Sequence, residues 1–275
     1  MLGTTRDNRD PRGERLGRRR WYRGRLAGVG VIGAVVVACG SSPQRTPDPA
    51  ARARFMTVDE LAAGKLDALP TGSQFIRVIN FHQAPGQSFP SRKHQPGIIY
   101  QSGGGQVLGY SDGQRVAIVA GRAAYQRSAE HAHTNTGADE NTWYFLALWP
   151  TAQRGTPLVV AGAEVAYETE DLPASALAPA QYVETLQRIT LQPGGRSAAH
   201  RLGGNEVVFV LDGAVTVKAA GRAAVHLVPG EGTYLAPDIP TQEIAAASAG
   251  ASYLVYVVIA VGRAFATDLD AAPAG

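Results

Sequence analysis

The stretch Gly194–Gly213 decides the fold, and it reads GGRSAAHRLGGNEVVFVLDG. Its first glycine is followed after five residues by His200, Leu202 comes two residues later, and Glu206 comes four residues after Leu202. The residues between Glu206 and the last glycine are mostly Val, Phe and Leu, which are typical of a strand that ends in a turn. Residues two apart on a strand share a face, so side chains at such spacings can be directed into one barrel interior.

A second pattern lies downstream. Residues 229–243 read PGEGTYLAPDIPTQE, in which a Pro-Gly turn, a short strand and a Pro-Asp-Ile-Pro turn precede Thr241.

The two patterns recur in the first half of the chain. Gly121 matches Gly230, and the block that ends at His131 matches the block that ends at Thr241. The offset is about 106 to 110 residues throughout. A period of this length indicates a duplicated domain rather than a solenoid.

Residues 70–262 resemble a tandem cupin, or bicupin. The first cupin motif, G-x5-H-x-H-x3-E-x6-G, is matched by Gly194–Gly213, except that Leu202 stands in place of the second histidine. The second motif typically ends in a Pro-Gly-x-Pro-His turn, and here Thr241 stands in the histidine position. The resemblance implies an all-β fold of two tandem small antiparallel jelly-roll barrels.

The first half shows the opposite pattern. Its second motif is well kept, because residues 131–137, HAHTNTG, place His131 and Asn135 in the His-x3-Asn spacing. Its first motif has one histidine, His94, and no glutamate.

The resemblance implies a metal centre. Metal cupins hold Fe, Mn, Ni, Cu or Zn with three histidines and a glutamate, and use it for dioxygenation, decarboxylation or isomerisation. In the first barrel His94 and His131 are placed to face inward, and His133 shares the face of His131 if the strand is straight. If a metal binds, we therefore expect one divalent transition metal in the first barrel. Asn135 and Tyr100 would support its ligands. The alternative is no metal, with His133 and the nearby Glu130 on the barrel rim in solvent.

The second barrel keeps His200 and Glu206 but neither of the other two histidines. Two ligands rarely hold a transition metal tightly, so we expect no metal there. The pair either binds a polar ligand or forms a hydrogen-bonded pair inside the barrel.

Residues 1–39 have the layout of a secretory signal. Nine arginines in residues 1–25 precede an apolar stretch over residues 26–38, which is shorter than the roughly 20 residues that span a bilayer. The sequence VVAC that ends at Cys39 resembles the bacterial lipobox, which implies that Cys39 is lipidated. We therefore expect a bacterial membrane protein, lipid-anchored on the extracytoplasmic face. Residues 18–23, RRRWYR, also resemble a twin-arginine export signal.

Without residues 1–39 the chain has 17 basic and 20 acidic residues, so the net positive charge of the whole chain comes from the signal. Nucleic acid is therefore not an expected partner. Cys39 is the only cysteine, which excludes a disulfide and a cysteine nucleophile once it is lipidated.

Turn residues divide the remainder into short strands, with one helix expected over Thr57–Lys65, where Thr57 and Glu60 have the spacing of a capping box. The expected organisation is a signal (1–39), a flexible tether (40–55), the first barrel (56–150), a connection (151–178), the second barrel (179–262) and a tail (263–275).

Three function classes fit these features. The leading hypothesis is an exported, membrane-anchored bicupin, non-catalytic or without an assigned activity, that binds a small molecule in a barrel pocket. The alternative is a metal-dependent, dioxygenase-like enzyme with its site in the first barrel. The third is a structural or partner-binding protein of the cell envelope. Independently of the function class, the resemblance to cupins implies that the chain can form a homodimer.

Overall fold

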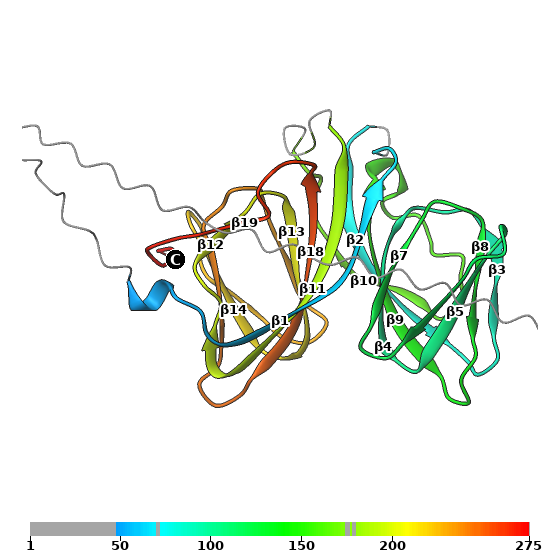
Figure 1. Ribbon diagram of the computed structural model, residues 1–275, viewed down its shortest axis with the longest axis horizontal. Helices are drawn as coiled ribbons and strands as arrows, with labels where there is room; N and C mark the ends of the chain where they lie inside the picture. Colours follow the sequence, from blue (N-terminus) through cyan, green and yellow to red (C-terminus); the bar gives the residue numbers. More distant parts are fainter. Residues whose placement is uncertain (1–47, 70–71, 174–176, 178–179, 275) are drawn as a thin grey trace, which may run out of the picture. The chain divides into compact units, whose positions relative to one another are not determined.

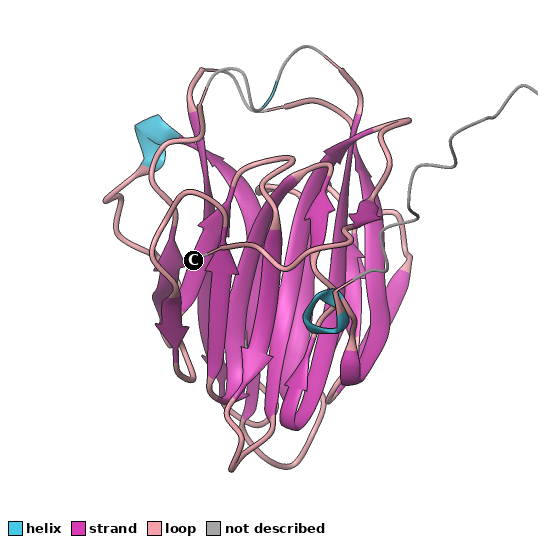
Figure 2. Cartoon of the chain, turned by 90° about the vertical axis from the view of Figure 1, so that its left-hand side faces the viewer, coloured by secondary structure: helices cyan, strands magenta, loops and turns pink. Residues whose placement is uncertain are grey.

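The computed structural model describes residues 48–69, 72–173, 177 and 180–274. The signal with Cys39 and the first part of the tether lie outside the described residues. Strands dominate the described chain, and its helical segments include two short 3-10 turns, η1 (Pro49–Ala51) and η2 (Thr151–Gln153) (Figure 2). No described helix has the length and apolar character needed to cross a membrane.

The first barrel consists of two antiparallel sheets with the strand orders β10-β2-β9-β4-β7 and β3-β8-β5-β6 (Figure 1). Alternating apolar residues and tight turns at glycines form these strands. Their bounds are β2 (Gln74–Gln83), β3 (Ser88–Arg92), β4 (Gly97–Gly103), β5 (Gly105–Tyr110), β6 (Arg115–Val119), β7 (Ala123–Gln126), β8 (His131–Asn135), β9 (Asn141–Pro150) and β10 (Ala163–Glu168).

In the second barrel the strands follow the order β15-β14-β17-β11-β18-β13-β16. Three further strands pair with members of this sheet: β1 with β11, β12 with β17, and β19 with β12. The long strand β11 connects two parts of this barrel, because it pairs with β18 along most of its length and with β17 at Arg196. The bounds are β1 (Arg54–Leu66), β11 (Tyr182–Arg196), β12 (His200–Leu202), β13 (Asn205–Gly213), β14 (Val215–Ala219), β15 (Val225–Leu227), β16 (Gly232–Leu235), β17 (Thr241–Ala245), β18 (Ala251–Ala260) and β19 (Ala266–Asp268). The all-β jelly-roll expectation is confirmed.

The helix expected over Thr57–Lys65 is wrong. This stretch lies in β1, which pairs antiparallel with β11 from Arg54 to Leu66. Its residues favour a helix locally, but an edge of β11 offers a full ladder of backbone hydrogen bonds, and tertiary pairing overrides a weak propensity. Strand β1, which the sequence assigns to the first barrel, therefore extends the sheet of the second.

The end of the expected tether is also held in place. Arg196 donates to the carbonyl oxygens of Arg52 at 3.1 Å and Pro49 at 2.7 Å, and Ala199 N donates to Ala51 O at 2.6 Å. Residues 49–52 are thus bound to the second barrel rather than free of it.

Three apolar clusters hold the molecule together. One fills each barrel, and the third lies between the barrels, where β2, β4 and β9 face β11, β13 and β18. Tyr100 and Tyr256 belong to this middle layer, and Glu184 of β11 is buried beside Tyr256.

Candidate metal centre

Three histidines of the first barrel come together. His131 and His133 occupy alternate positions of β8, so both face the interior and both are buried. His94 lies in the turn between β3 and β4. One ring nitrogen of each histidine lies within 4.8 Å of those of the other two, which a single metal ion can bridge.

A chain of buried amides fixes the tautomer of His133. Gln101 Nε2 donates to the carbonyl oxygens of Gly103 at 2.6 Å and Thr142 at 3.1 Å, so Gln101 Oε1 is left as an acceptor. Gln106 Nε2 donates to that oxygen at 2.9 Å, which places Gln106 Oε1 3.0 Å from His133 Nδ1. Because this oxygen only accepts, His133 carries its proton on Nδ1 and a lone pair on Nε2.

His131 is fixed in the same tautomer. Its Nδ1 lies 2.7 Å from the carbonyl oxygen of Ala129 and donates to it, so its Nε2 also carries a lone pair. The two Nε2 atoms of His131 and His133 are 3.2 Å apart. Two nitrogens bound to one ion at about 2.1 Å and roughly 90–110° apart are separated by about 3.0–3.4 Å. Two lone pairs at this spacing, with no proton between them, fit a shared metal ion.

Burial keeps the three imidazoles neutral, which is the form that binds a metal. Burial and the neighbouring His131 lower the pKa of His94 to about 4. Burial also lowers the pKa of His131, and it holds the pKa of His133 well below its usual range. His94 Nδ1 has a donor, Gln126 Nε2, at 2.9 Å and an acceptor, Gln95 O, at 3.3 Å, so either tautomer of His94 has a partner.

A cavity of about 260 Å³ lies beside His94 and His133. Trp143 stacks on His133 with ring centroids 4.9 Å apart, and Phe81 stacks on Trp143 at 4.0 Å. Such a lining favours a flat apolar ligand. The aromatic residues that line it are Phe81, Phe89, Trp143, Phe145 and Trp149.

Two residues that line this cavity each have a polar atom without a partner. The indole nitrogens of Trp143 and Trp149 are buried and have no acceptor among the residues that the structure describes. Arg77 also lines the cavity, but its guanidinium donates to Glu168 at 2.6 Å and to Gln153 O at 3.2 Å. The wall of the cavity therefore contains two indole N–H groups without an acceptor among the described residues, and the exposed cation Arg92 also lines it.

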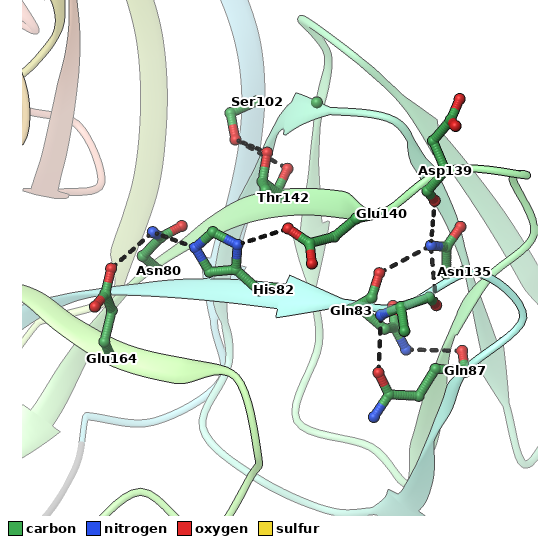
Figure 3. A network of polar contacts seen from close by, with 12 residues as sticks. Asn80, His82, Gln83, Gln87, Ser102, Asn135, Asp139, Glu140, Thr142 and Glu164 are labelled. Carbon is green, nitrogen blue, oxygen red and sulfur yellow. Dashed lines mark hydrogen bonds and ion pairs between the residues drawn. The ribbon is translucent and has the colours of Figure 1, made fainter.

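Asn135, expected beside the metal, supports the end of β8 instead. Its Nδ2 donates to the carbonyl oxygens of Gln83 at 2.9 Å and Asp139 at 2.8 Å (Figure 3). Its Oδ1 accepts from Gly137 N at 2.9 Å. Gln83 Nε2 in turn donates to the backbone oxygen of His133 at 2.9 Å. Asn135 thus acts on the histidines through the backbone of the strand.

Tyr100, the other expected supporting residue, lies in the apolar layer between the barrels and not among the histidines. Glu130 is exposed. His82 is partly exposed and contacts Glu140 and Asn80 (Figure 3).

In the second barrel Glu243 joins His200 and Glu206, and the ligand atoms of the three lie within 4.8 Å of one another. Burial and Glu243 raise the pKa of Glu206 to about 8. The cupin motif does not indicate Glu243, because it places a ligand only at the position of Thr241. The signal was present, since Glu243 is two residues further along β17 and shares the face of Thr241.

Strand register shows which positions of the two barrels correspond. Leu108 of β5 pairs with His133, and Val217 of β14 pairs with Glu243. His133 and Glu243 therefore occupy equivalent positions, each two residues beyond the last histidine position of the cupin motif.

In the first barrel Gly97 stands at the position that Glu206 has in the second, and close packing leaves no room for a side chain there. Gly97 precedes Ile98, which pairs with Leu146, as Glu206 precedes Val207, which pairs with Tyr256. A Cβ at Gly97 would lie 2.6 Å from the backbone oxygen of Leu146, so no side chain fits there without a shift of the backbone. The first barrel offers three imidazoles and no carboxylate at this place.

Structural comparison agrees with this architecture. Oxalate decarboxylase from Lactobacillus farciminis, in a formate complex, has a TM-score of 0.52 and 11% identity, over 79% of this chain and 86% of that one. Oxalate decarboxylase from Bacillus subtilis, a protein with Mn(II) centres, has a TM-score of 0.53 and 9% identity, over 82% of each chain. The chain has the cupin fold. No family model matches it, and no curated protein matches it in sequence.

Proposed function

We propose that this chain is a membrane-anchored bicupin whose first barrel binds one divalent transition metal through His94, His131 and His133. The observation that supports the metal most directly is the pair of lone pairs on His131 Nε2 and His133 Nε2, 3.2 Å apart. Imidazole ligands suit Zn, Cu, Fe and Ni. Three protein ligands leave a coordination position open, which would give the bound metal a Lewis-acid function toward a ligand in the cavity.

The cavity beside the three histidines indicates which class of small molecule binds there. A volume of about 260 Å³ with stacked aromatic walls suits a small planar aromatic compound. The indole N–H groups of Trp143 and Trp149 would donate to an oxygen on this compound, since burial without an acceptor is costly. We therefore infer a phenolic or aromatic carboxylic ligand.

Elemental analysis tests the metal. The full chain is purified in mild detergent without chelator, beside His131→Ala and the matched control His82→Ala, which changes a histidine outside the centre. We expect a metal in the wild type and in the control that is absent from His131→Ala. Equal metal contents in wild type and His131→Ala would contradict the proposal.

The ligand is tested separately by isothermal titration with simple phenols and benzoates. Trp143→Phe, which keeps an aromatic ring but removes the N–H donor, should weaken binding by about 5- to 30-fold, the loss of a hydrogen bond of 1–2 kcal/mol. Tight binding that is the same in both proteins would exclude the assigned cavity.

A second candidate, a metal-dependent enzyme acting on the same ligand, is favoured by the ligand count, because three histidines leave positions open for a second reactant. Oxygen uptake by the metal-loaded protein in the presence of a phenol distinguishes it from a binding protein. Uptake that depends on His131 supports the enzyme, and tight binding without uptake or product supports the binding protein.

The membrane anchor is a proposal of its own, and it rests on the sequence ending at Cys39. Labelling of cells with radioactive palmitate should mark the wild type but not Cys39→Ala. Label on both chains would contradict the anchor and leave the barrel chemistry unaffected.

A further inference from the structure

Gln126 is a buried polar residue beside the first centre that the proposed function does not use. It is the last residue of β7, it is fully buried, and its amide lies against His94. Its Oε1 has no hydrogen-bond partner among the described residues. A buried amide with an unpaired oxygen is costly, so the contacts of its nitrogen need an explanation.

The neighbours of this amide fix its orientation. Gln126 Nε2 lies 3.0 Å from the carbonyl oxygen of Gln95, which only accepts, so an amide oxygen in this place would be repelled. The same nitrogen lies 2.9 Å from His94 Nδ1. Because an amide nitrogen carries two hydrogens and accepts none, His94 Nδ1 accepts the second hydrogen.

The proton of His94 is therefore on Nε2. Burial lowers the pKa of His94 to about 4, so its ring is neutral and carries a single proton. A proton on Nδ1 would face the N–H of Gln126 at 2.9 Å, and the acceptor for that tautomer, Gln95 O, is farther away at 3.3 Å. His94 thus differs from His131 and His133, which carry their protons on Nδ1.

Both ring nitrogens of His94 are blocked in this state. An ion at Nε2 requires the proton to move to Nδ1, where it meets the N–H of Gln126. An ion at Nδ1 requires the lone pair that Gln126 already occupies. In either case the contact between Gln126 and His94 has to break before His94 can become a ligand.

We propose that Gln126 is a positioning residue that holds His94 in a hydrogen-bonded state in which it cannot bind a metal ion. This inference deepens the proposed metal function and rests on it. An ion binds first to His131 and His133, and His94 joins as the third ligand when the contact breaks. Gln126 therefore weakens the affinity of the first centre, whereas Gln106, which fixes the tautomer of His133, strengthens it.

The tautomer of His94 is measured without metal. Two-bond ¹H–¹⁵N correlation NMR of the chelator-treated full chain, in mild detergent, distinguishes the two nitrogens of each imidazole, and His94→Ala identifies the signals of His94. We expect the proton on Nε2 in the wild type and on Nδ1 in Gln126→Leu, where Gln95 O becomes its acceptor. A proton on Nδ1 of His94 in the wild type would overturn the proposal.

Titration with Zn²⁺ measures the effect on metal binding. Gln126→Leu removes the N–H that opposes the third ligand, so it should bind Zn²⁺ about 5- to 30-fold more tightly than the wild type, the equivalent of one hydrogen bond. Gln106→Leu is the matched control, because it removes another buried amide beside the same centre and should weaken binding. His131→Ala shows how much Zn²⁺ binds outside this centre. Amides that only fill space would give the same sign in both leucine variants.

Equal or weaker Zn²⁺ binding by Gln126→Leu would overturn the proposal. Circular dichroism checks that each variant is folded, and Gln126→Met, which keeps the length of the side chain, is the second variant if Gln126→Leu is not. If Zn²⁺ binds to neither the wild type nor Gln126→Leu, the proposed metal function is contradicted, and the NMR result alone decides whether Gln126 sets the tautomer of His94.

Discussion

Trp143 lies face to face with His133, with ring centroids 4.9 Å apart and ring planes 6° from parallel. The indole is therefore a built-in reporter of any metal bound by this imidazole. It also holds the imidazole plane, because Phe81 stacks on the same indole at 4.0 Å.

Binding of Cu²⁺ or Ni²⁺ to the first centre should quench the fluorescence of Trp143, because these ions accept energy at short range. Titration of the chelator-treated chain should give saturable quenching. Trp143→Phe should lose this quenching, and Trp149→Phe should keep it. Equal quenching in the two variants would show that the ion binds elsewhere.

The amide chain to His133 gives a second prediction. In Gln106→Leu no acceptor fixes the proton on His133 Nδ1, so metal affinity of the first centre should fall about 10- to 100-fold. Metal titration by calorimetry measures the change. The exposed Gln114→Leu is the control and should bind like the wild type. Unchanged affinity in Gln106→Leu would mean that the tautomer is not set by this chain.

The close packing at Gly97 predicts a loss of stability. A methyl group there would lie 2.6 Å from the backbone oxygen of Leu146, so Gly97→Ala should lower the free energy of unfolding by about 1–3 kcal/mol. Gly109→Ala is the matched control, because a Cβ on this strand glycine meets nothing within 4 Å. Urea denaturation compares the two. Equal stability of both variants would contradict the steric argument.

The buried Glu184 predicts how stability depends on pH. Burial raises its pKa to about 8, against an ordinary value of 4.5, and Tyr256 donates to its Oε1 at 2.5 Å. Between these values the folded chain keeps a proton that the unfolded chain releases, so stability is lost as pH rises from about 4.5 to 8. The slope from one such group is at most about 1.4 kcal/mol per pH unit.

Glu184→Gln keeps an acceptor for Tyr256 but has no proton to lose. Its stability should therefore depend less on pH between about 4.5 and 8 than that of the wild type, with the largest relative gain near pH 8. Urea denaturation across this range, with the exposed Glu60→Gln as control, measures the slopes. Parallel curves for wild type and Glu184→Gln would contradict the prediction.

Sequence patterns were sufficient for most strands. The short strands expected between turn residues include β6 (Arg115–Val119) and β16 (Gly232–Leu235), which apolar residues between glycine turns define locally. Strand β1 was missed because its residues favour a helix, and only the distant strand β11 makes it extended.

The candidate site was predicted only in part, because some of its residues follow a local sequence pattern and others do not. His131 and His133 are brought to one face by the period of a strand, which sequence shows directly. Glu243 has that relation to Thr241 but follows no motif. The role of Gln101 and Gln106 depends on amide orientations set by the carbonyl oxygens of Gly103 and Thr142, which no local pattern reveals.

The pairing of β1 with β11 bears on the order in which the chain folds. Asp59 contacts Arg188, which lies 129 positions further along the chain. A chain made from its amino end releases β1 first, yet β1 has no partner strand until the first barrel and the connection have followed. Such a distant pairing slows folding and leaves an edge that can aggregate. The histidine-bearing barrel can therefore close before the segment that precedes it has found its place.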